Sequence, residues 1–284
     1  MIEEQLKLFL DNNFNDEEKF SLIKANGLSA IMADYYSEYP LSEFAKKMKS
    51  NNRVIHIVKK GQMAKLIKDF DHDGISVLYF KGDVLQSLLF GNVDLRPAGD
   101  IDIYVTPAKF NTAMSILKDN GFIFRDCNTI NNNHHVQYVK GHIKLELHKN
   151  LFNPFTKINE TVFFDHLVPY KCKEYNCLTF DNTATILHLF YHLYMDTLLD
   201  KRNFDPIMKN NLSMAKRFLF RAYEIAKYVF IFKEQIDWDQ INSDIASQKL
   251  RIYFKNMIIV INVIFPEILP KSFLNSVCKK EYTE

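Results

Sequence analysis

The run DIDIYV at residues 100–105 constrains the fold more than any other stretch of the chain. Successive side chains of a β-strand point to opposite faces, so the apolar residues at alternate positions are expected to face a core. Asp100 and Asp102 would then lie side by side on the other face. Neighbouring carboxylates repel each other, and a divalent cation relieves that repulsion. The run therefore predicts a sheet with a cation site, whereas a solvated strand edge is the alternative.

A second acidic strand is expected in a hairpin over residues 134–148, with its turn at Lys140-Gly141. The apolar residues of the second arm alternate with polar ones, which places Glu146 on the polar face. If this arm neighbours the first acidic strand, three carboxylates converge. Oxygen ligands favour Mg²⁺ or Mn²⁺ over zinc. The alternative is an ordinary exposed glutamate, because Lys144 and His148 share its face.

The hydrophobic spacing changes twice along the chain. Residues 1–75 have mainly helical spacing, 76–150 alternate strand-like and helical pieces, and 151–284 form a mixed connector followed by helices. Strands are expected at 77–80, 101–105, from 122, near 168–170 and at 177–180, and helices after Gly82-Asp83, at 107–120 and at 181–196. The expected fold is α+β, with a small mixed β-sheet core between N-terminal and C-terminal helical regions. In the first region, Val54, Val58, Met63, Leu66, Ile67 and Phe70 are expected on the buried face.

Composition excludes several classes of protein. The chain has 36 Lys and Arg against 34 Asp and Glu, so a broad basic face for duplex DNA is not expected. It has only 8 glycines and neither GxGxxG nor GxxxxGK[ST]. The acidic N-terminus does not resemble a signal peptide, and the apolar run Met257–Phe265 is too short to cross a bilayer. Cys127, Cys172, Cys177 and Cys278 form no CxxC pair, so we expect them to be reduced thiols. The expected protein is soluble and cytoplasmic, and a membrane is not among its expected partners.

An ordered set of motifs runs through the centre of the chain. It comprises Lys81-Gly82 after a strand, then a helix, Arg96, Asp100-Ile101-Asp102-Ile103 and Glu146-Leu147-His148. The set resembles the uncharacterised nucleotidyltransferase family of the DNA polymerase beta-like nucleotidyltransferase superfamily. The likeness covers most of the chain, from Asn26-Gly27-Leu28 to the later helix with Leu187-His188 and His192.

The resemblance implies a metal-dependent enzyme. It would move a nucleoside monophosphate from an NTP, such as ATP, to a hydroxyl or phosphate of a small-molecule, peptide or protein acceptor and release pyrophosphate. Asp100 and Asp102 would hold two Mg²⁺ (or Mn²⁺) ions. Glu146 would complete the metal site and help to deprotonate the acceptor. The NTP and an unidentified acceptor are the expected partners, and nucleic acid is possible but not favoured.

The expected nucleotide-binding residues are Lys81, Gly82, Asp83 and Arg96. Gly82 would let phosphates approach backbone N–H groups at a helix N-terminus. Where this chain has Gly82-Asp83, the wider superfamily has Gly-Ser or Gly-Gly. The Asp83 carboxylate would repel a phosphate unless it points away as a helix cap. Lys81 could instead be simply exposed, and Arg96 could pair with Asp94, Asp100 or Asp102.

Histidines are the remaining candidates. His134, His135, His142 and His148 gather in the expected hairpin, which raises the idea of a zinc site, but no cysteine accompanies them. A place in the acceptor pocket is favoured, and His135, His148 and His192 are the residues expected there. Arg221 and Glu224 are expected to form an ion pair within a helix. The basic residues at 201–202 and 216–217 could be a solvated helical face or could meet an anionic acceptor.

Three other functions remain open at the level of sequence. The acceptor could be RNA, as in tRNA-modifying members or toxins, although strand binding requires a positive groove with stacking aromatic residues. The chain could be a catalytically inactive nucleotide-binding module, but all three carboxylates are present. A phosphodiesterase or other metal hydrolase would need an activated water in place of the acceptor hydroxyl.

Overall fold

The computed structural model describes residues 1–36, 41–91, 95–97, 99–125, 134–152, 156, 158–198, 217–248 and 251–278. These residues form two compact units, one of 1–48 and 182–284 and the other of 49–181. We call them the helical unit and the sheet unit. Cys127, Asp94 and the basic residues 201–202 and 216, which the sequence singled out, lie outside the described residues. The division at residues 75 and 150 stays a prediction.

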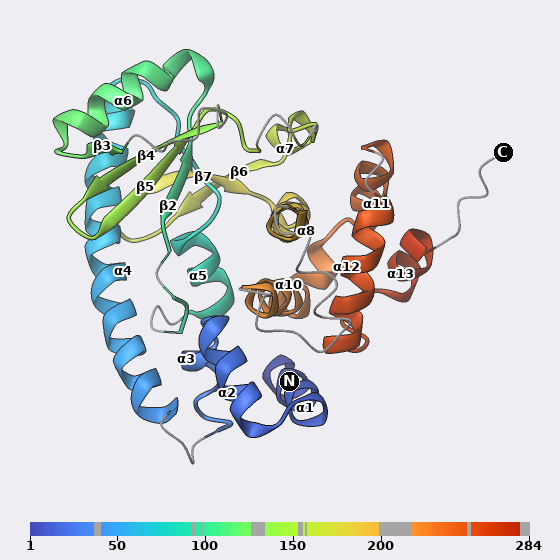
Figure 1. The fold of residues 1–284 in the computed structure, drawn as a ribbon. Coiled ribbons are helices and arrows are strands. Elements are labelled where there is room, and N and C mark those ends of the chain that lie inside the picture. The colour runs from blue at the N-terminus through green and yellow to red at the C-terminus, as the bar shows by residue number, and fades with distance from the viewer. Residues whose placement is uncertain are drawn as a thin grey trace. The chain divides into compact units, whose positions relative to one another are not determined.

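The helical unit contains the expected helices of both ends of the chain (Figure 1). They are α1 (Ile2–Asn13), α2 (Asp16–Ala25), α3 (Ser29–Met32), the start of α4 (Leu41–His72), α8 (Asn182–Leu198), α10 (Phe218–Phe232), α11 (Trp238–Ser247), α12 (Arg251–Ile264) and α13 (Lys271–Cys278). Asn15 caps α2 by accepting a hydrogen bond from the N–H of Glu18. The predicted pair on α10 is confirmed, since Arg221 Nη1 lies 2.8 Å from Glu224 Oε2. Among the described residues, no helix combines the length and apolarity needed to cross a membrane.

The sheet unit is built on seven strands. They are β1 (Leu78–Tyr79), β2 (Ile101–Tyr104), β3 (Ile123–Arg125), β4 (His135–Lys140), β5 (Ile143–His148), β6 (Leu167–Lys171) and β7 (Asn176–Phe180). Their order is β3-β4-β5-β2-β1-β7-β6. Pairs β2–β5 and β1–β7 are parallel and the others antiparallel. The mixed sheet and the helices at both ends confirm the predicted α+β class.

Among the described residues of the sheet unit, three helices and the rest of α4 accompany the sheet (Figure 1). They are α5 (Asp83–Phe90), α6 (Phe110–Asp119), which follows a 3₁₀ turn at Pro107–Lys109, and α7 (Thr161–Phe164). Ile101 and Ile103 of β2 share one buried core with Leu145 of β5, Met63 of α4 and Leu117 of α6. This core confirms the predicted alternation of both strands. The opposite face of β2 and β5 carries their polar residues.

Three local expectations were wrong. β2 begins at Ile101, so Asp100 precedes the strand instead of lying inside it. The N-cap of α5 is Gly82, and Asp83 is its first helical residue. Val54 and Val58 are exposed at 60% and 48%, because the helix turns a different face toward the core. The buried face of α4 near these residues carries the polar residues Asn52, His56 and Lys59.

Candidate active site

The parallel pairing of β2 with β5 brings two of the predicted carboxylates together. Asp102 lies directly opposite Glu146, and Tyr104 lies opposite His148. His148 Nε2 is 3.4 Å from Asp102 Oδ1 and 3.5 Å from Glu146 Oε2. One ligand atom from each of Asp102, Glu146 and His148 lies within 4.8 Å of the others. The strand neighbourhood that the sequence required for convergence is therefore present.

Electrostatic coupling extends to Asp100. Burial raises the pKa of Asp100, and repulsion from Glu146 and Asp102 raises it further, while Lys144 and Lys59 act in the opposite direction. A carboxyl group whose ionisation is opposed by two neighbouring carboxylates is a group that a divalent cation would stabilise. The chemistry of Asp100, Asp102 and Glu146 therefore fits such an ion.

Glu146 and His148 influence each other. Burial raises the pKa of Glu146, but the closeness of the His148 and His135 imidazoles outweighs burial and leaves it below the ordinary value. Burial lowers the pKa of His148, but the closeness of the Asp102 and Glu146 carboxylates outweighs burial and leaves it raised. Glu146 is consequently ionised at neutral pH, with an imidazole beside it.

Lys81 reaches the same place from the end of β1. Its Nζ lies 3.7 Å from Asp102 Oδ1, and its side chain is only 18% exposed. The ammonium also lies over the Phe80 ring, 5.4 Å from the ring centroid. The structure therefore brings this cation to the carboxylates instead of leaving it in solvent.

The turn after Lys81 requires glycine. Gly82 has φ of 62° and ψ of −119°, a conformation that other residues rarely adopt. A Cβ at this position would lie 2.9 Å from the Tyr79 hydroxyl oxygen and 3.5 Å from the carbonyl oxygen of Asp100. The backbone N–H of Asp83 donates to the Tyr79 hydroxyl over 3.2 Å. The turn is thus held by Tyr79 and lies close to Asp100, the residue that leads into β2.

Asp83 does not present its carboxylate at the surface of the turn. The residue is 2% exposed, and its Oδ1 lies 2.6 Å from His56 Nδ1 on α4. The presence of Asp83 where the wider superfamily has Ser or Gly therefore has a structural explanation, because its carboxylate forms a hydrogen bond with His56 in the interior of the sheet unit. Its assignment as a nucleotide contact stays a prediction.

Sequence reasoning missed a polar stripe on α4. Asn52, His56 and Lys59 are spaced four and three residues apart, and all three are buried. Burial lowers the pKa of Lys59, whereas Asp83, Asp100 and Asp102 raise it and the Arg96 guanidinium lowers it. Polar residues at helical spacing between exposed valines were the available signal.

Arg96 is itself 6% exposed, which is unusual for an arginine without a structural or binding role.

The histidines separate into groups. One nitrogen from each of His134, His135 and His148 lies within 4.8 Å of the others. Burial lowers the pKa of His134 to about 3, with smaller contributions from His135 and His148. His192 lies on α8 in the helical unit, 6.1 Å from His188 between ring centroids. A place for His192 in an acceptor pocket stays a prediction.

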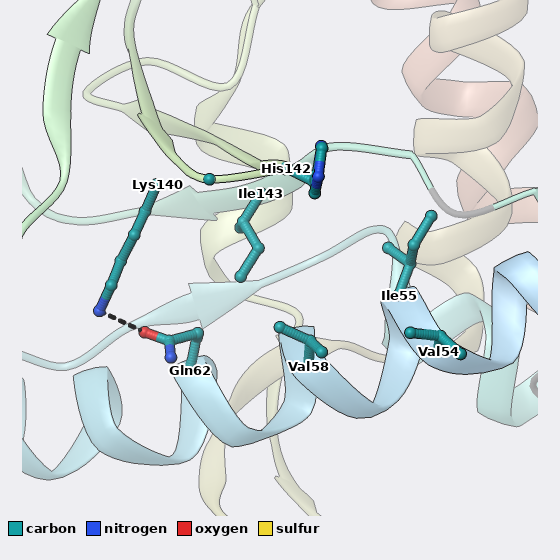
Figure 2. Close-up of a pocket in the computed structure, with 8 residues that line it drawn as sticks. Val54, Ile55, Val58, Gln62, Lys140, His142 and Ile143 are labelled. Carbon is teal, nitrogen blue, oxygen red and sulfur yellow. Dashed lines mark hydrogen bonds between the residues drawn. The ribbon is translucent and has the colours of Figure 1, made fainter.

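A hollow of about 370 Å³ opens between α4 and the turn of the β4–β5 hairpin (Figure 2). Its lining is Val54, Ile55, Val58, Gln62, Lys140, Gly141, His142 and Ile143. At one side, Lys140 Nζ donates to Gln62 Oε1 over 2.8 Å. None of the expected catalytic or nucleotide-binding residues lines it, so the hollow is distinct from the carboxylate site.

A sequence model of the family described as "Uncharacterised nucleotidyltransferase" matches residues 13–266. Among solved structures, the chain is similar to an antigenic nucleotidyltransferase-like protein from Paracoccidioides brasiliensis, with 11% identity and a TM-score of 0.40. That similarity covers 70% of this chain and 91% of the other chain. No curated protein matches the chain significantly.

Proposed function

Since the chain belongs to the family of uncharacterised nucleotidyltransferases, we propose that it transfers a nucleoside monophosphate from an NTP to an acceptor and releases pyrophosphate. The acceptor group is a hydroxyl or phosphate of a small molecule, peptide or protein. The observation that carries this proposal is the opposition of Asp102 and Glu146 on adjacent parallel strands. Lys81 lies beside the Asp102 carboxylate. The Gly82 turn that follows it lies close to the backbone carbonyl of Asp100. Both are placed as binding of a triphosphate beside these carboxylates requires.

Asp100, Asp102 and Glu146 are the proposed ligands of Mg²⁺, or of Mn²⁺. When bound, a divalent ion neutralises phosphate charge and polarises the phosphoryl oxygens. The closeness of the Asp102 and Glu146 carboxylates supports this assignment. The raised pKa of Asp100, caused by burial and by the neighbouring carboxylates, supports it as well.

The remaining roles belong to the nucleotide-binding residues. Gly82 lets the triphosphate approach the backbone where α5 begins, and the positive end of the helix dipole favours the anion. Lys81 and Arg96 supply positive charge, with Arg96 able to hold phosphate oxygens in a bidentate manner. Asp83 positions the turn through its bond to His56.

Glu146 is the proposed base. It accepts the proton of the acceptor hydroxyl, the hydroxyl oxygen forms a bond to the α-phosphorus, and the bond to the leaving pyrophosphate breaks. An ionised Glu146 at neutral pH supports this role, because a base must be unprotonated before it acts. His135 and His148 adjoin Glu146 and remain, with His192, the residues proposed for the acceptor side.

A radiolabel assay tests the proposal. Each of the four NTPs, labelled at the α-phosphate, is incubated with the protein, Mg²⁺ or Mn²⁺, and extract of the source cell. Label transferred to one fraction, with pyrophosphate released, is the expected result. Asp102→Asn and Glu146→Gln should reduce transfer by at least about 100-fold, whereas Glu174→Gln, at an exposed position of the same unit, should not.

Other outcomes would redirect the assignment. Label recovered in RNA would identify RNA as the acceptor in place of a small molecule, peptide or protein. NTP binding without transfer in any extract would make the chain an inactive nucleotide-binding module. Absence of NTP binding would overturn the roles given to Lys81, Gly82 and Arg96.

A further inference from the structure

Three imidazole rings meet where β4 begins and β5 ends. His135 is the first residue of β4 and pairs with His148, the last residue of β5, while His134 immediately precedes β4. The ring centroids of His134 and His135 are 4.1 Å apart. His148 lies 5.6 Å from the first ring and 5.0 Å from the second. The backbone pairing of the two strands thus holds the three rings together.

The nitrogen atoms of this cluster are incompletely satisfied. Nδ1 of His134 and both ring nitrogens of His148 are buried and have no hydrogen-bond partner among the described residues. A buried polar atom without a partner costs free energy and calls for an explanation such as an ion. His148 itself is 3% exposed. Three buried nitrogens without a hydrogen-bond partner in one cluster of rings indicate that the cluster binds an ion.

The spacing of the nitrogens suits a metal. Ligands of a tetrahedral zinc ion lie about 2.0–2.1 Å from the metal and hence about 3.4 Å from one another. His134 Nε2 and His135 Nδ1 form a hydrogen bond of 2.7 Å, which a bound metal would replace. One nitrogen from each of the three rings lies within 4.8 Å of the others. Small side-chain rotations would therefore bring three nitrogens to ligand distances. Imidazole ligands favour zinc, copper, iron and nickel over magnesium.

We propose that His134, His135 and His148 form a transition-metal site of the zinc class, beside the carboxylates. Three imidazoles are a known zinc ligand set that leaves a fourth position open. The carboxylates of Asp102 and Glu146 add negative charge next to His148, which favours a dication. The assignment of the neighbouring carboxylates to Mg²⁺ rests on the proposed function, but the histidine site does not require it.

Cobalt binding tests the site. Metal-free protein is titrated with Co²⁺ in excess Mg²⁺, and the visible absorption of the Co²⁺–imidazole complex is recorded and then displaced with Zn²⁺. We expect one equivalent of Co²⁺ to bind. His134→Gln and His135→Gln should each weaken binding by more than about tenfold. His142→Gln, in the turn between the same two strands and outside the cluster, is the matched control and should bind as the wild type does.

The outcomes separate this inference from the proposed function. Retention of Co²⁺ binding by Asp102→Asn, together with its loss in the histidine variants, would support a distinct site whether or not nucleotidyl transfer is found. Loss of binding only in Asp102→Asn and Glu146→Gln would overturn it, because the ion would then belong to the carboxylates. Absence of Co²⁺ binding would overturn it as well and leave the histidines as acceptor-side residues. Circular dichroism of each variant shows whether misfolding causes a loss of Co²⁺ binding. His135→Asn serves as a second substitution at the same position.

Discussion

The ammonium group of Lys59 lies in the field of three carboxylates although its residue is only 3% exposed. Burying an unpaired lysine is costly, and the negative charges of Asp83, Asp100 and Asp102 offset part of that cost. The same charges repel one another when no cation is bound. The amino group of Lys59 is therefore coupled electrostatically to Asp100 and Asp102, two of the proposed metal ligands.

Lys59→Met should raise the pKa of Asp100 further, because Lys59 is one of the two cations that lower it. The carboxyl carbon of Asp100 can be followed by NMR during an acid titration of metal-free protein. Lys68→Met, on an exposed part of the same helix, should leave that titration unchanged. An unaltered Asp100 pKa in Lys59→Met would contradict the coupling.

Gly82→Ala tests the backbone of the turn. The positive φ and the approach of a new Cβ to within 2.9 Å of the Tyr79 hydroxyl should destabilise the protein by about 1–3 kcal/mol. Gly61 is the matched control, since a Cβ added at its position within α4 would have no atom within 4 Å. Gly61→Ala should stabilise by about 0.5–1 kcal/mol. Urea unfolding measures both, and equal effects would refute the role of the turn.

Among the elements, α4 and α5 are joined by a buried pair. His56 on α4 and Asp83 on α5 are each 2% exposed at the side chain, and their atoms Nδ1 and Oδ1 are 2.6 Å apart. Through this pair, a long helix outside the motif region fixes the start of the helix that follows the glycine turn. Packing of α4 against the sheet thus contributes to the shape of the proposed phosphate site.

A double-mutant cycle measures that connection. His56→Ala and Asp83→Ala should each destabilise the protein, and together they should cost less than their sum, with a coupling of about 0.5–3 kcal/mol. Asp83→Asn should cost less than Asp83→Ala, because the amide oxygen can still accept a hydrogen bond. Additive costs in urea unfolding would mean that the two helices are not coupled through this pair.

Helices α1 and α10 are joined by Glu3, whose Oε1 lies 2.7 Å from both Tyr223 Oη and Lys227 Nζ. Burial raises the pKa of Glu3, but the hydrogen bonds from Lys227 and Tyr223 outweigh burial and leave it below 4.5. A lowered pKa means that the ionised form stabilises the fold above pH 4.5 and that this contribution is lost as the pH falls through the lowered value.

The stability difference between the wild type and Glu3→Gln should therefore be largest near neutral pH. It should shrink as the pH falls below 4.5. Thermal unfolding at a series of pH values measures this, and Glu17→Gln, at an exposed position of α2, should show no comparable difference. A difference that is constant over the acid range would show that the lost contact does not depend on the charge of Glu3.

At the scale of the whole molecule, every predicted residue of the proposed chemistry except His192 lies in one unit, residues 49–181. Binding of Mg²⁺ with an NTP at about 100 times its Kd should raise the free energy of unfolding by about 2.7 kcal/mol. Hydrogen exchange should slow in β2, β5 and the start of α5. Asp102→Asn should abolish both effects, and protection confined to the helical unit would contradict the placement of the site.

The sequence predicts the faces of β2 and β5, because strand periodicity is a local property and places Asp102 and Glu146 opposite to the buried isoleucines and leucines. It likewise predicts the turn at Gly82. The folded sheet places Asp102 opposite Glu146, since the register of strands that are far apart in the sequence follows from packing of the whole sheet. The tertiary structure also decided that α4 buries His56 and Lys59, and that Asp83 points inward. The helical spacing of Asn52, His56 and Lys59 indicates that they share one face of α4, but whether that face is buried depends on what packs against it.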